Sequence, residues 1–450
     1  MNLLDQNSFT LPIEAQSYNK IALRLIPFLI LLYVISFLDR VNVGFAKLQM
    51  ASDIGLSDTA YGLGAGIFFF GYCLFEIPSN LLLQRFGAKF WIARILVIWG
   101  IISMCMATVS SHTSFYVLRF LLGVAEAGFY PGIILYLTYW FPARLRSQVT
   151  ALFFLGMPIA VLAGAPISGW IMGKFSGEMG WAGWQWLFII EGMPAFLLGI
   201  VVFFYLDNGP AFANWLSSDE KKLVVEELAS EEKQQQTEGV GHKFSHVMKD
   251  INVWMLAFAN FSLLAGLYGV TFWLPQIIKD LGVKDLLING LITTIPFATA
   301  AIIMIMIGKR SDRTKERKWH MILCAVAGAL GLILSAYFSS NIVISLIGLS
   351  LAASGVLASF AVMWTLPSVF FRGPAAAAGI ALMATIGNLG GYAAPLMMGI
   401  VKQSTQRLDY GLYLLAGLIL LGTLTMLLIP KLRKPNASTY VVKTPSRSGI

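Results

Sequence analysis

The chain alternates between long apolar runs and short polar segments along almost its whole length. Twelve runs are each near or above the roughly 20 residues that an α-helix needs to cross a bilayer. Helices are expected because every backbone amide at membrane depth must be satisfied within its own segment. The runs lie at about 22–39, 59–83, 90–110, 113–140, 148–173, 184–206, 251–279, 286–308, 319–338, 342–367, 374–401 and 409–430.

This pattern predicts an all-α membrane protein with 12 transmembrane helices in two six-helix bundles, joined by a cytoplasmic central loop. In that loop, Ser217 or Ser218 can cap an amphipathic helix that has Asp219 and Glu220 in its first turn. The expected units are a cytoplasmic N-tail at 1–20, an N-terminal bundle at 21–206, a linker at 207–250, a C-terminal bundle at 251–431 and a cytoplasmic C-tail at 432–450.

Composition and charge support a membrane protein and give its orientation. The chain is 57% hydrophobic and 12% charged, whereas soluble domains carry about 25% charged residues. Of its 32 Lys and Arg residues, 24 fall in the two tails and in the loops on the same side of the membrane as the tails. Six fall in the loops on the opposite side, including Lys47, and Arg40 and Arg119 lie within the apolar runs. This bias places both termini in the cytoplasm of a multi-pass protein of a bacterial-type inner (plasma) membrane. The net charge of +9 therefore reports topology and predicts no nucleic-acid partner.

Metal and enzyme chemistry find little support in the sequence. The three cysteines lie far apart inside apolar runs, which argues against a metal site or a disulfide framework. His242 and His246 are four residues apart, but no further Cys or His lies near them. We also find no nucleophile–base cluster, so neither an enzyme nor a bound metal is predicted.

One polar segment occurs twice in the chain. Residues 80–91 follow the second apolar run, and residues 308–319 follow the eighth. The same segment in each half implies two parallel repeats, with a substrate site near the membrane midplane between them. The positions that coincide at one offset are Gln84 and Asp312, Arg85 and Arg313, Lys89 and Arg317, and Trp91 and Trp319.

Ionisable residues at membrane depth are confined to the first half. Such residues are costly and usually face a partner or a watery cavity. Arg119 and Glu126 are seven residues apart, which places them on one helix face roughly 10 Å apart along the axis. The others are Asp39, Arg40 and Glu76, whereas the second half offers aromatic and amide groups: Asn260, Tyr268, Trp273, Gln276, Trp364, Asn388 and Tyr392.

These residues suggest a proton switch beside an anion site. Burial disfavours the charged form of a carboxyl group, and a nearby cation favours it. Asp39 and Glu126, each next to an arginine, can therefore alternate between paired and protonated states. Arg40 or Arg119 can hold a substrate carboxylate through two hydrogen bonds.

Each of these assignments has a structural alternative. Asp39–Arg40 can be a static pair at a helix end, and Arg119–Glu126 a fixed internal bridge. Glu76 fits a gate or a packing role, and for Glu191 we expect a structural bond to loop backbone.

The repeated segments resemble the signature G-x-x-x-D-R-x-G-R-K of the major facilitator superfamily. Asn80 and Gln84 replace the Gly and the Asp in the first copy, whereas the second copy keeps Gly308, Asp312 and Arg313. The sequence also resembles the anion:cation symporter branch, which includes carriers of sugar acids, tartrate, phthalate, hydroxyphenylacetate and, more distantly, vesicular glutamate. The segments that carry this second resemblance are FLDRVNVGFA at 37–46, EIPSN at 76–80, RFLLGVAEAGFYPG at 119–132 and WQWLFIIEG at 184–192.

The resemblance implies roles for individual residues. It supports Asp39 and Glu126 as proton sites and Arg40 as a substrate contact, and it extends less directly to Tyr72 and Asn388. Arg119 and Trp364 complete the substrate-binding candidates. A latch that opens and closes between the halves is expected at Gln84, Arg85, Asp312 and Arg313, with Glu76 as a gating residue.

Taken together, the sequence predicts a monomeric secondary active symporter, with no cofactor beyond the proton as coupling ion. It would import an organic carboxylate, either an aromatic acid or a sugar acid, by rocker-switch alternating access. A drug or cation exporter of the same fold is the main alternative. A membrane receptor that senses a solute is a remote one, since the central loop has no room for an output domain. Which carboxylate is carried stays open.

Overall fold

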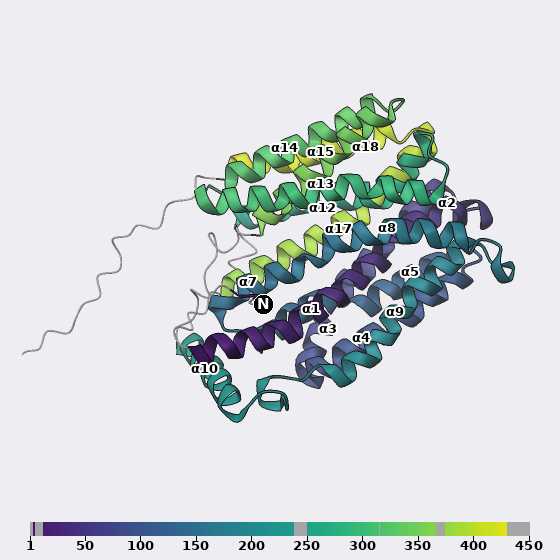
Figure 1. Cartoon of the computed structure of the whole chain (residues 1–450). Helices are drawn as coiled ribbons and strands as arrows, with labels where there is room; N and C mark the ends of the chain where they lie inside the picture. Colours follow the sequence, from purple (N-terminus) through teal and green to yellow (C-terminus); the bar gives the residue numbers. More distant parts are fainter. Residues whose placement is uncertain are drawn as a thin grey trace, which may run out of the picture.

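The fold is that of a computed structural model, which describes residues 3–4, 12–237, 250–314, 316–364, 366 and 374–429. Side chains at 232, 234–237 and 374–378 are not part of that description. The expected C-tail at 432–450 and both His242 and His246 lie outside the described residues. Within them, every regular element is a helix, and the long helices run roughly side by side (Figure 1).

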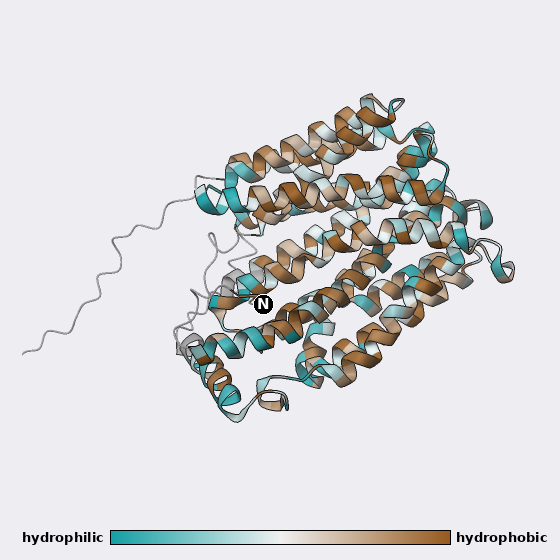
Figure 2. Cartoon of the chain, viewed as in Figure 1, coloured by the Kyte–Doolittle hydropathy of each residue, from teal (hydrophilic) through white to brown (hydrophobic). Residues whose placement is uncertain are grey.

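Twelve helical segments are long and apolar enough to cross a membrane in the described part of the chain, which confirms the predicted fold class. Figure 2 shows apolar residues along the middle of the helices and polar residues gathered at both ends of the bundle. The helices of the N-terminal half are α1 (Pro12–Val41), α2 (Val43–Asp53), α3 (Asp58–Phe86), α4 (Ala88–Cys105), α5 (His112–Glu126), α6 (Phe129–Thr138), α7 (Ala143–Phe154), α8 (Gly156–Lys174) and α9 (Gly183–Tyr205). Those of the C-terminal half are α12 (Ile251–Asp280), α13 (Leu286–Thr314), α14 (Lys318–Tyr337), α15 (Ile342–Met363), α17 (Pro374–Thr405) and α18 (Asp409–Leu428).

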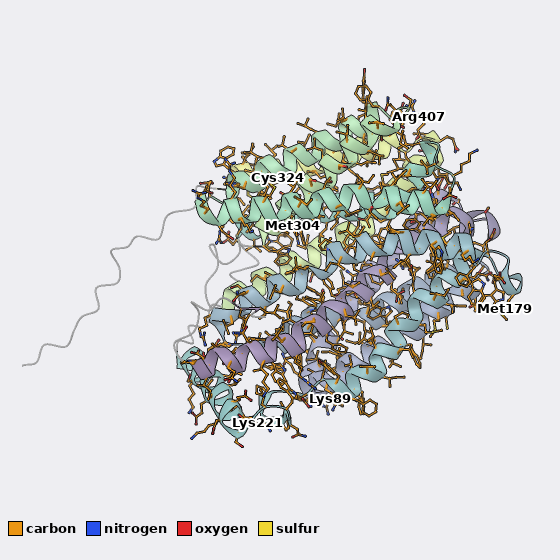
Figure 3. The ribbon with its side chains drawn as sticks, viewed as in Figure 1. Lys89, Met179, Lys221, Met304, Cys324 and Arg407 are labelled. Atoms are coloured by element: carbon orange, nitrogen blue, oxygen red, sulfur yellow. The ribbon has the colours of Figure 1, made fainter. Side chains whose placement is uncertain are left out.

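The two ends of the bundle differ in what they carry. We call the end where α1 begins and α18 ends the tail end, and the opposite end the far end. Figure 3 places Lys221 at the tail end, and Met179 and Arg407 at the far end.

Three spans of the N-terminal half are each built from two helices in succession: α1 with α2, α5 with α6, and α7 with α8. The break between α5 and α6 falls at Gly128, whose φ of 84° lies in the left-handed region. A Cβ atom there would also lie 2.4 Å from the Ser79 hydroxyl oxygen on α3. Glycine therefore satisfies both the turn and the close approach of α3.

The two halves meet through helix pairs that approach backbone to backbone. Helix α17 packs along α3, and α13 packs along α8. A Cβ atom added at Gly62 would lie 2.4 Å from the carbonyl oxygen of Pro395, and one at Gly290 would lie 2.4 Å from that of Ala165. Small residues permit this closeness between membrane helices. All four of these positions lie toward the far end of their helices.

Lys47 also belongs to this closed far end, and its predicted place in a polar loop is wrong. It lies in α2, only 3% exposed, because the chain continues as a helix past the end of the first apolar run. Its Nζ atom lies 2.6 Å from a carboxylate oxygen of Asp58 and 3.8 Å from the ring centre of Trp273 in the C-terminal half. A second lysine, Lys279 of α12, donates a hydrogen bond of 3.1 Å to the carbonyl oxygen of Leu48. Cations thus join the halves at this end.

The helix predicted in the central loop is present as α10 (Ser218–Thr237). Its cap is Ser217, one of the two predicted serines. The Ser217 hydroxyl accepts a hydrogen bond from the amide of Glu220, and the Glu220 carboxylate accepts one of 2.7 Å from the amide of Ser217. This reciprocal arrangement satisfies two amides that the helix itself leaves free.

Contacts with α1 hold α10 against the tail end. Lys20 lies 2.8 Å from the Glu220 carboxylate, and the Tyr18 hydroxyl donates a hydrogen bond of 2.8 Å to Glu227. Partial burial opposes the charge of Glu220, but the hydrogen bonds from Lys20 and Ser217 outweigh it, so the pKa of Glu220 is lowered from its ordinary value.

Candidate functional site

A buried ion pair between α1 and α5 forms the centre of the candidate site. Arg40, near the end of α1, pairs through Nη2 with Oε1 of Glu126, the last residue of α5. The Ser36 hydroxyl donates a hydrogen bond of 2.8 Å to the same oxygen. Ser36 and Arg40 are four residues apart and therefore share one face of α1. Glu126 is fully buried, so this pair is held away from the surface.

Arg40 also reaches the C-terminal half. Its Nη1 atom donates a hydrogen bond of 3.3 Å to the hydroxyl of Tyr268 on α12. Its guanidinium carbon lies 5.3 Å from the ring centres of both Phe68 and Tyr72 on α3. Nε of Arg40 and Oε2 of Glu126 are buried without a hydrogen-bond partner among the described residues. Arg40 is therefore a cation at the junction of the two halves, with one donor still to use.

The expected pairing of Arg119 with Glu126 is wrong. Arg119 is fully buried and donates hydrogen bonds of 3.3 Å and 3.2 Å to the carbonyl oxygens of Gly64 and Ala65 on α3. Its guanidinium carbon lies 5.0 Å from the ring centre of Phe68. Arg119 and Glu126 share one face of α5, but two helical turns separate them by roughly 10 Å along the axis, which is too far for a direct ion pair. Each side chain therefore bonds to a neighbouring helix.

Asp39 does not pair with Arg40 either. Successive residues on a helix point about 100° apart, so Asp39 faces α4 while Arg40 faces α5. Its carboxylate accepts hydrogen bonds from Trp99 Nε1 at 2.7 Å, Ser103 Oγ at 2.8 Å and Asn42 Nδ2 at 3.2 Å. The described residues offer it no ion pair, and neutral donors replace the expected cation.

Glu191 is a further buried acid, and the expected bond to loop backbone is wrong. It lies in the interior of α9, only 2% exposed. The Ser168 hydroxyl on α8 donates a hydrogen bond of 2.6 Å to its Oε1 atom. With it, the described acids and arginines buried at membrane depth all lie in the N-terminal half: Asp39, Arg40, Arg119, Glu126 and Glu191.

Of the remaining substrate-binding candidates, one lies beside Arg40 and two do not. Tyr72 is buried and stands beside Arg40, as expected for a shared site. Asn388 lies half-buried on α17, next to a glycine that packs closely against Asn260. Trp364 ends α15, and its ring centre lies 6.0 Å from that of Phe360. Neither Asn388 nor Trp364 shows a contact with Arg40 in the described part, so their roles stay predictions.

The latch candidates lie at the tail end of the two repeats. Gln84 and Arg85 close α3, Asp312 and Arg313 lie at the end of α13, and all four are exposed. Glu76 is half-buried on α3, one helical turn from Tyr72. No ion pair joins these residues across the halves in the described portion, where the contacts between halves gather at the far end. Their gating roles therefore stay predictions.

Several residues of the site escaped the sequence reasoning. Ser36 could have been found from its spacing of four from Arg40, and Asn42 from its spacing of three from Asp39. Trp99 and Ser103 carry no such signal, because they reach Asp39 from a helix about 60 residues further along the chain. Only the folded chain brings them together, because α4 packs on α9 and α5 and reaches Asp39 of α1 through these two side chains.

Comparison with known proteins agrees with this architecture. The family described as Major Facilitator Superfamily matches residues 29–395. A protein of Agrobacterium vitis named for tartrate transport is 47% identical over 419 residues, which cover 93% of this chain and 92% of the relative. A quinolone resistance transporter of Acinetobacter baumannii is 40% identical over 433 residues, covering 96% and 99%.

Solved structures show the same fold. The xylose transporter XylE of E. coli, in a partially occluded inward open conformation, superposes with a TM-score of 0.74 at 14% identity, covering 91% of this chain and 98% of that one. The family and the names of these relatives indicate a transporter rather than an enzyme. The relative named for tartrate transport also agrees with the anion:cation symporter branch. The chain belongs to the Major Facilitator Superfamily.

Proposed function

We propose that this multi-pass membrane transporter is a proton-coupled symporter that imports an organic carboxylate by alternating access. The observation that carries the proposal is Arg40, a buried cation paired with a buried carboxylate and touching both halves. The bias of Lys and Arg supports an orientation with both tails in the cytoplasm. We further propose that the monomer is the working unit.

Exchange of partners at Arg40 supplies the coupling. A substrate carboxylate that binds Arg40 competes with Glu126 for the same cation. A buried carboxylate deprived of its cation is strongly disfavoured, so Glu126 takes up a proton when the substrate arrives. The neutral Glu126 then leaves the guanidinium free for two hydrogen bonds to the substrate.

The aromatic side chains around Arg40 shape the rest of the site. Phe68 and Tyr72 place ring faces or edges beside the guanidinium, and Tyr268 brings a hydroxyl from the other half. The Tyr268 hydroxyl, which contacts Arg40 here, can form a hydrogen bond to the substrate when the two halves change their relative orientation. This combination suits a carboxylate that also carries hydroxyl groups, and the relative named for tartrate transport supports such a substrate.

Uptake into proteoliposomes tests the proposal. Purified protein is given radiolabelled tartrate, a sugar acid or an aromatic acid, with and without a pH gradient that is acidic outside. We expect the gradient to drive accumulation of at least one of these acids. Glu126→Gln should abolish that accumulation while retaining exchange of substrate across the membrane, because glutamine mimics the protonated side chain. Uptake that ignores the gradient in both proteins would refute proton coupling.

Two further variants sharpen the test. Glu178→Gln makes the same chemical change at an exposed position of the far end and should behave as the parent protein. Arg40→Lys keeps the charge but loses the paired donors, so it should weaken substrate binding more than it alters gradient dependence.

A drug exporter of the same fold remains the second candidate, because one relative is named for quinolone resistance. Two buried arginines favour an anionic cargo over a cationic one. Cells that express the protein should therefore gain no resistance to cationic drugs. Resistance that disappears in Glu126→Gln would instead support the exporter.

A further inference from the structure

Two buried oxygen atoms beside the candidate site lack a hydrogen-bond donor. They are Oε2 of Glu191 on α9 and Oδ1 of Asn42, between α1 and α2. Glu191 is 2% exposed and Asn42 is 1% exposed, so bulk water does not cover the gap. Buried polar atoms in proteins are nearly always bonded, and two orphaned acceptors in one region indicate a missing donor between them.

Both residues belong to one cluster around Asp39. The Asn42 amide donates to Asp39. The Asn42 side chain also lies within hydrogen-bonding range of Glu191, and the Asp39 carboxylate acts on Glu191 as a nearby negative charge. The backbone supports the same proximity, because a Cβ atom added at Gly192 would lie 3.0 Å from Ser103, a donor to Asp39. Asn42 therefore lies between two carboxyl groups.

The donors are shared unequally between these two acids. The Asp39 carboxylate accepts three hydrogen bonds, from Trp99, Ser103 and Asn42. Glu191 accepts one bond of normal length, from Ser168, with the Asn42 side chain further away. Hydrogen bonds to the charged form stabilise it, so Asp39 is the better site for the negative charge. A second carboxylate next to it, without a cation of its own, is disfavoured by repulsion and by burial.

We propose that Asp39 and Glu191 bind one proton between them, and that it resides on Oε2 of Glu191 and is donated to Oδ1 of Asn42. The Asn42 amide then donates in turn to Asp39, so all the orphaned acceptors of the cluster are satisfied. Release of the proton breaks the Oε2–H bond and leaves a second carboxylate, with the proton passing to water.

This site is separate from the one at Glu126. Asp39 and Arg40 leave α1 in different directions, and Arg40 bonds to Glu126 and Tyr268 rather than to the Glu191 side. Asp39 is the charged group that acts on Glu191 in the described structure, while α8 and α4 present the neutral Ser168 and Ser103. We expect the proton on the Asp39–Glu191 pair to be transported with the substrate, and this part of the inference rests on the proton symport proposed above. The presence of a proton on the pair does not rest on it.

Infrared spectroscopy of the purified protein tests the proton itself. Glu191→Gln keeps an acceptor for Ser168 and supplies an amide donor for Asn42, so it should fold. Near neutral pH, the parent protein should show a carboxylic-acid carbonyl band that Glu191→Gln lacks and that the exposed control Glu178→Gln retains. In Asn42→Ala the band should shift, because its acceptor is gone. A Glu191→Gln spectrum that equals the parent in this region would overturn the proposal.

Proton counting tests the coupling role. The number of protons that enter per substrate is measured in proteoliposomes from the substrate accumulated at a fixed pH gradient. We expect Glu191→Gln to transport one proton fewer than the parent protein, and an unchanged number would refute a transported proton at Glu191. If the parent shows no proton coupling at all, symport fails, but the infrared result still decides whether the pair holds a proton.

Discussion

Replacing Gly62 by alanine should open the far end of the bundle. The added Cβ atom would lie 2.4 Å from the Pro395 carbonyl oxygen and 3.0 Å from the Cα atom of Leu396. Contacts below 3.0 Å are essentially absent for real Cβ atoms, so α3 and α17 must separate by at least 0.6 Å there. Because both obstacles are backbone atoms, no side-chain rotation can relieve the clash.

The clash sets the size of the effect. Overpacking a close interface costs about 1–3 kcal/mol. At about 2 kcal/mol, the population of the conformer closed at the far end falls roughly 30-fold relative to one open there, since every 1.4 kcal/mol is tenfold. The higher helix propensity of alanine, about 1 kcal/mol, acts on both conformers alike and does not offset this shift.

Distance measurements between spin labels at the far end would detect the shift. Ser52 in the N-terminal half and Ser404 in the C-terminal half are both exposed there and can carry the labels. The labelled background requires alanine at the three cysteines, Cys73, Cys105 and Cys324. We expect Gly62→Ala to transfer population from the short distance to a longer one, and to slow transport.

Gly417→Ala supplies the matched control. It makes the same change inside α18, where an added Cβ atom meets nothing within 4 Å. Its distance distribution should equal that of the parent protein. Equal distributions in all three proteins would show that the α3–α17 contact does not hold the far end closed.

Two further predictions concern a buried donor and a surface contact. Trp99→Phe removes a hydrogen bond to the carboxylate of Asp39 and should lower the stability of the detergent-solubilised protein by about 1.5–3 kcal/mol in thermal unfolding. The control Trp181→Phe, at an exposed site, should change the stability by less than about 0.5 kcal/mol. Similar losses in both variants would show that the Trp99–Asp39 bond does not stabilise the protein. Because the pKa of Glu220 is lowered from its ordinary value, the bond to Lys20 stabilises the docked α10 at any pH above that ordinary value. This stabilisation is lost as the pH falls through the lowered pKa of the folded state. The protection of α10 amides, which is their exchange rate relative to the intrinsic rate at the same pH, should therefore fall on acidification more in the parent than in Glu220→Gln, and an equal fall in both would argue against it.

The spans and α10 could be predicted because their signals are local. Apolar length alone marks a span, and Ser217 with Glu220 three residues later marks a helix start. Lys47 shows the limit of such signals. A polar segment after the first apolar run reads as a loop, but the chain is helical there as α2 and packs Lys47 against Trp273 of the other half.

Partners in the site could not be predicted for a related reason. Helical spacing correctly placed Arg119 and Glu126 on one face, yet it does not reveal which neighbouring helix each of them meets. Arg40 pairs with Glu126 because the fold brings the end of α5 within reach of this side chain of α1. Arg119 instead meets backbone carbonyl oxygens of α3, a partner that no side-chain pattern can reveal.

The confinement of buried charge to one half has an electrical consequence. Moving one elementary charge across a potential of 100 mV requires about 2.3 kcal/mol. The described C-terminal half holds no charged side chain deep in the membrane, so its motion across the field requires no such work. The N-terminal half buries two arginines, Arg40 and Arg119, and three acids, Asp39, Glu126 and Glu191. With one proton on Glu191, the charges of these five groups sum to zero, and this buried set then contributes no net charge to a voltage response until substrate and further protons bind.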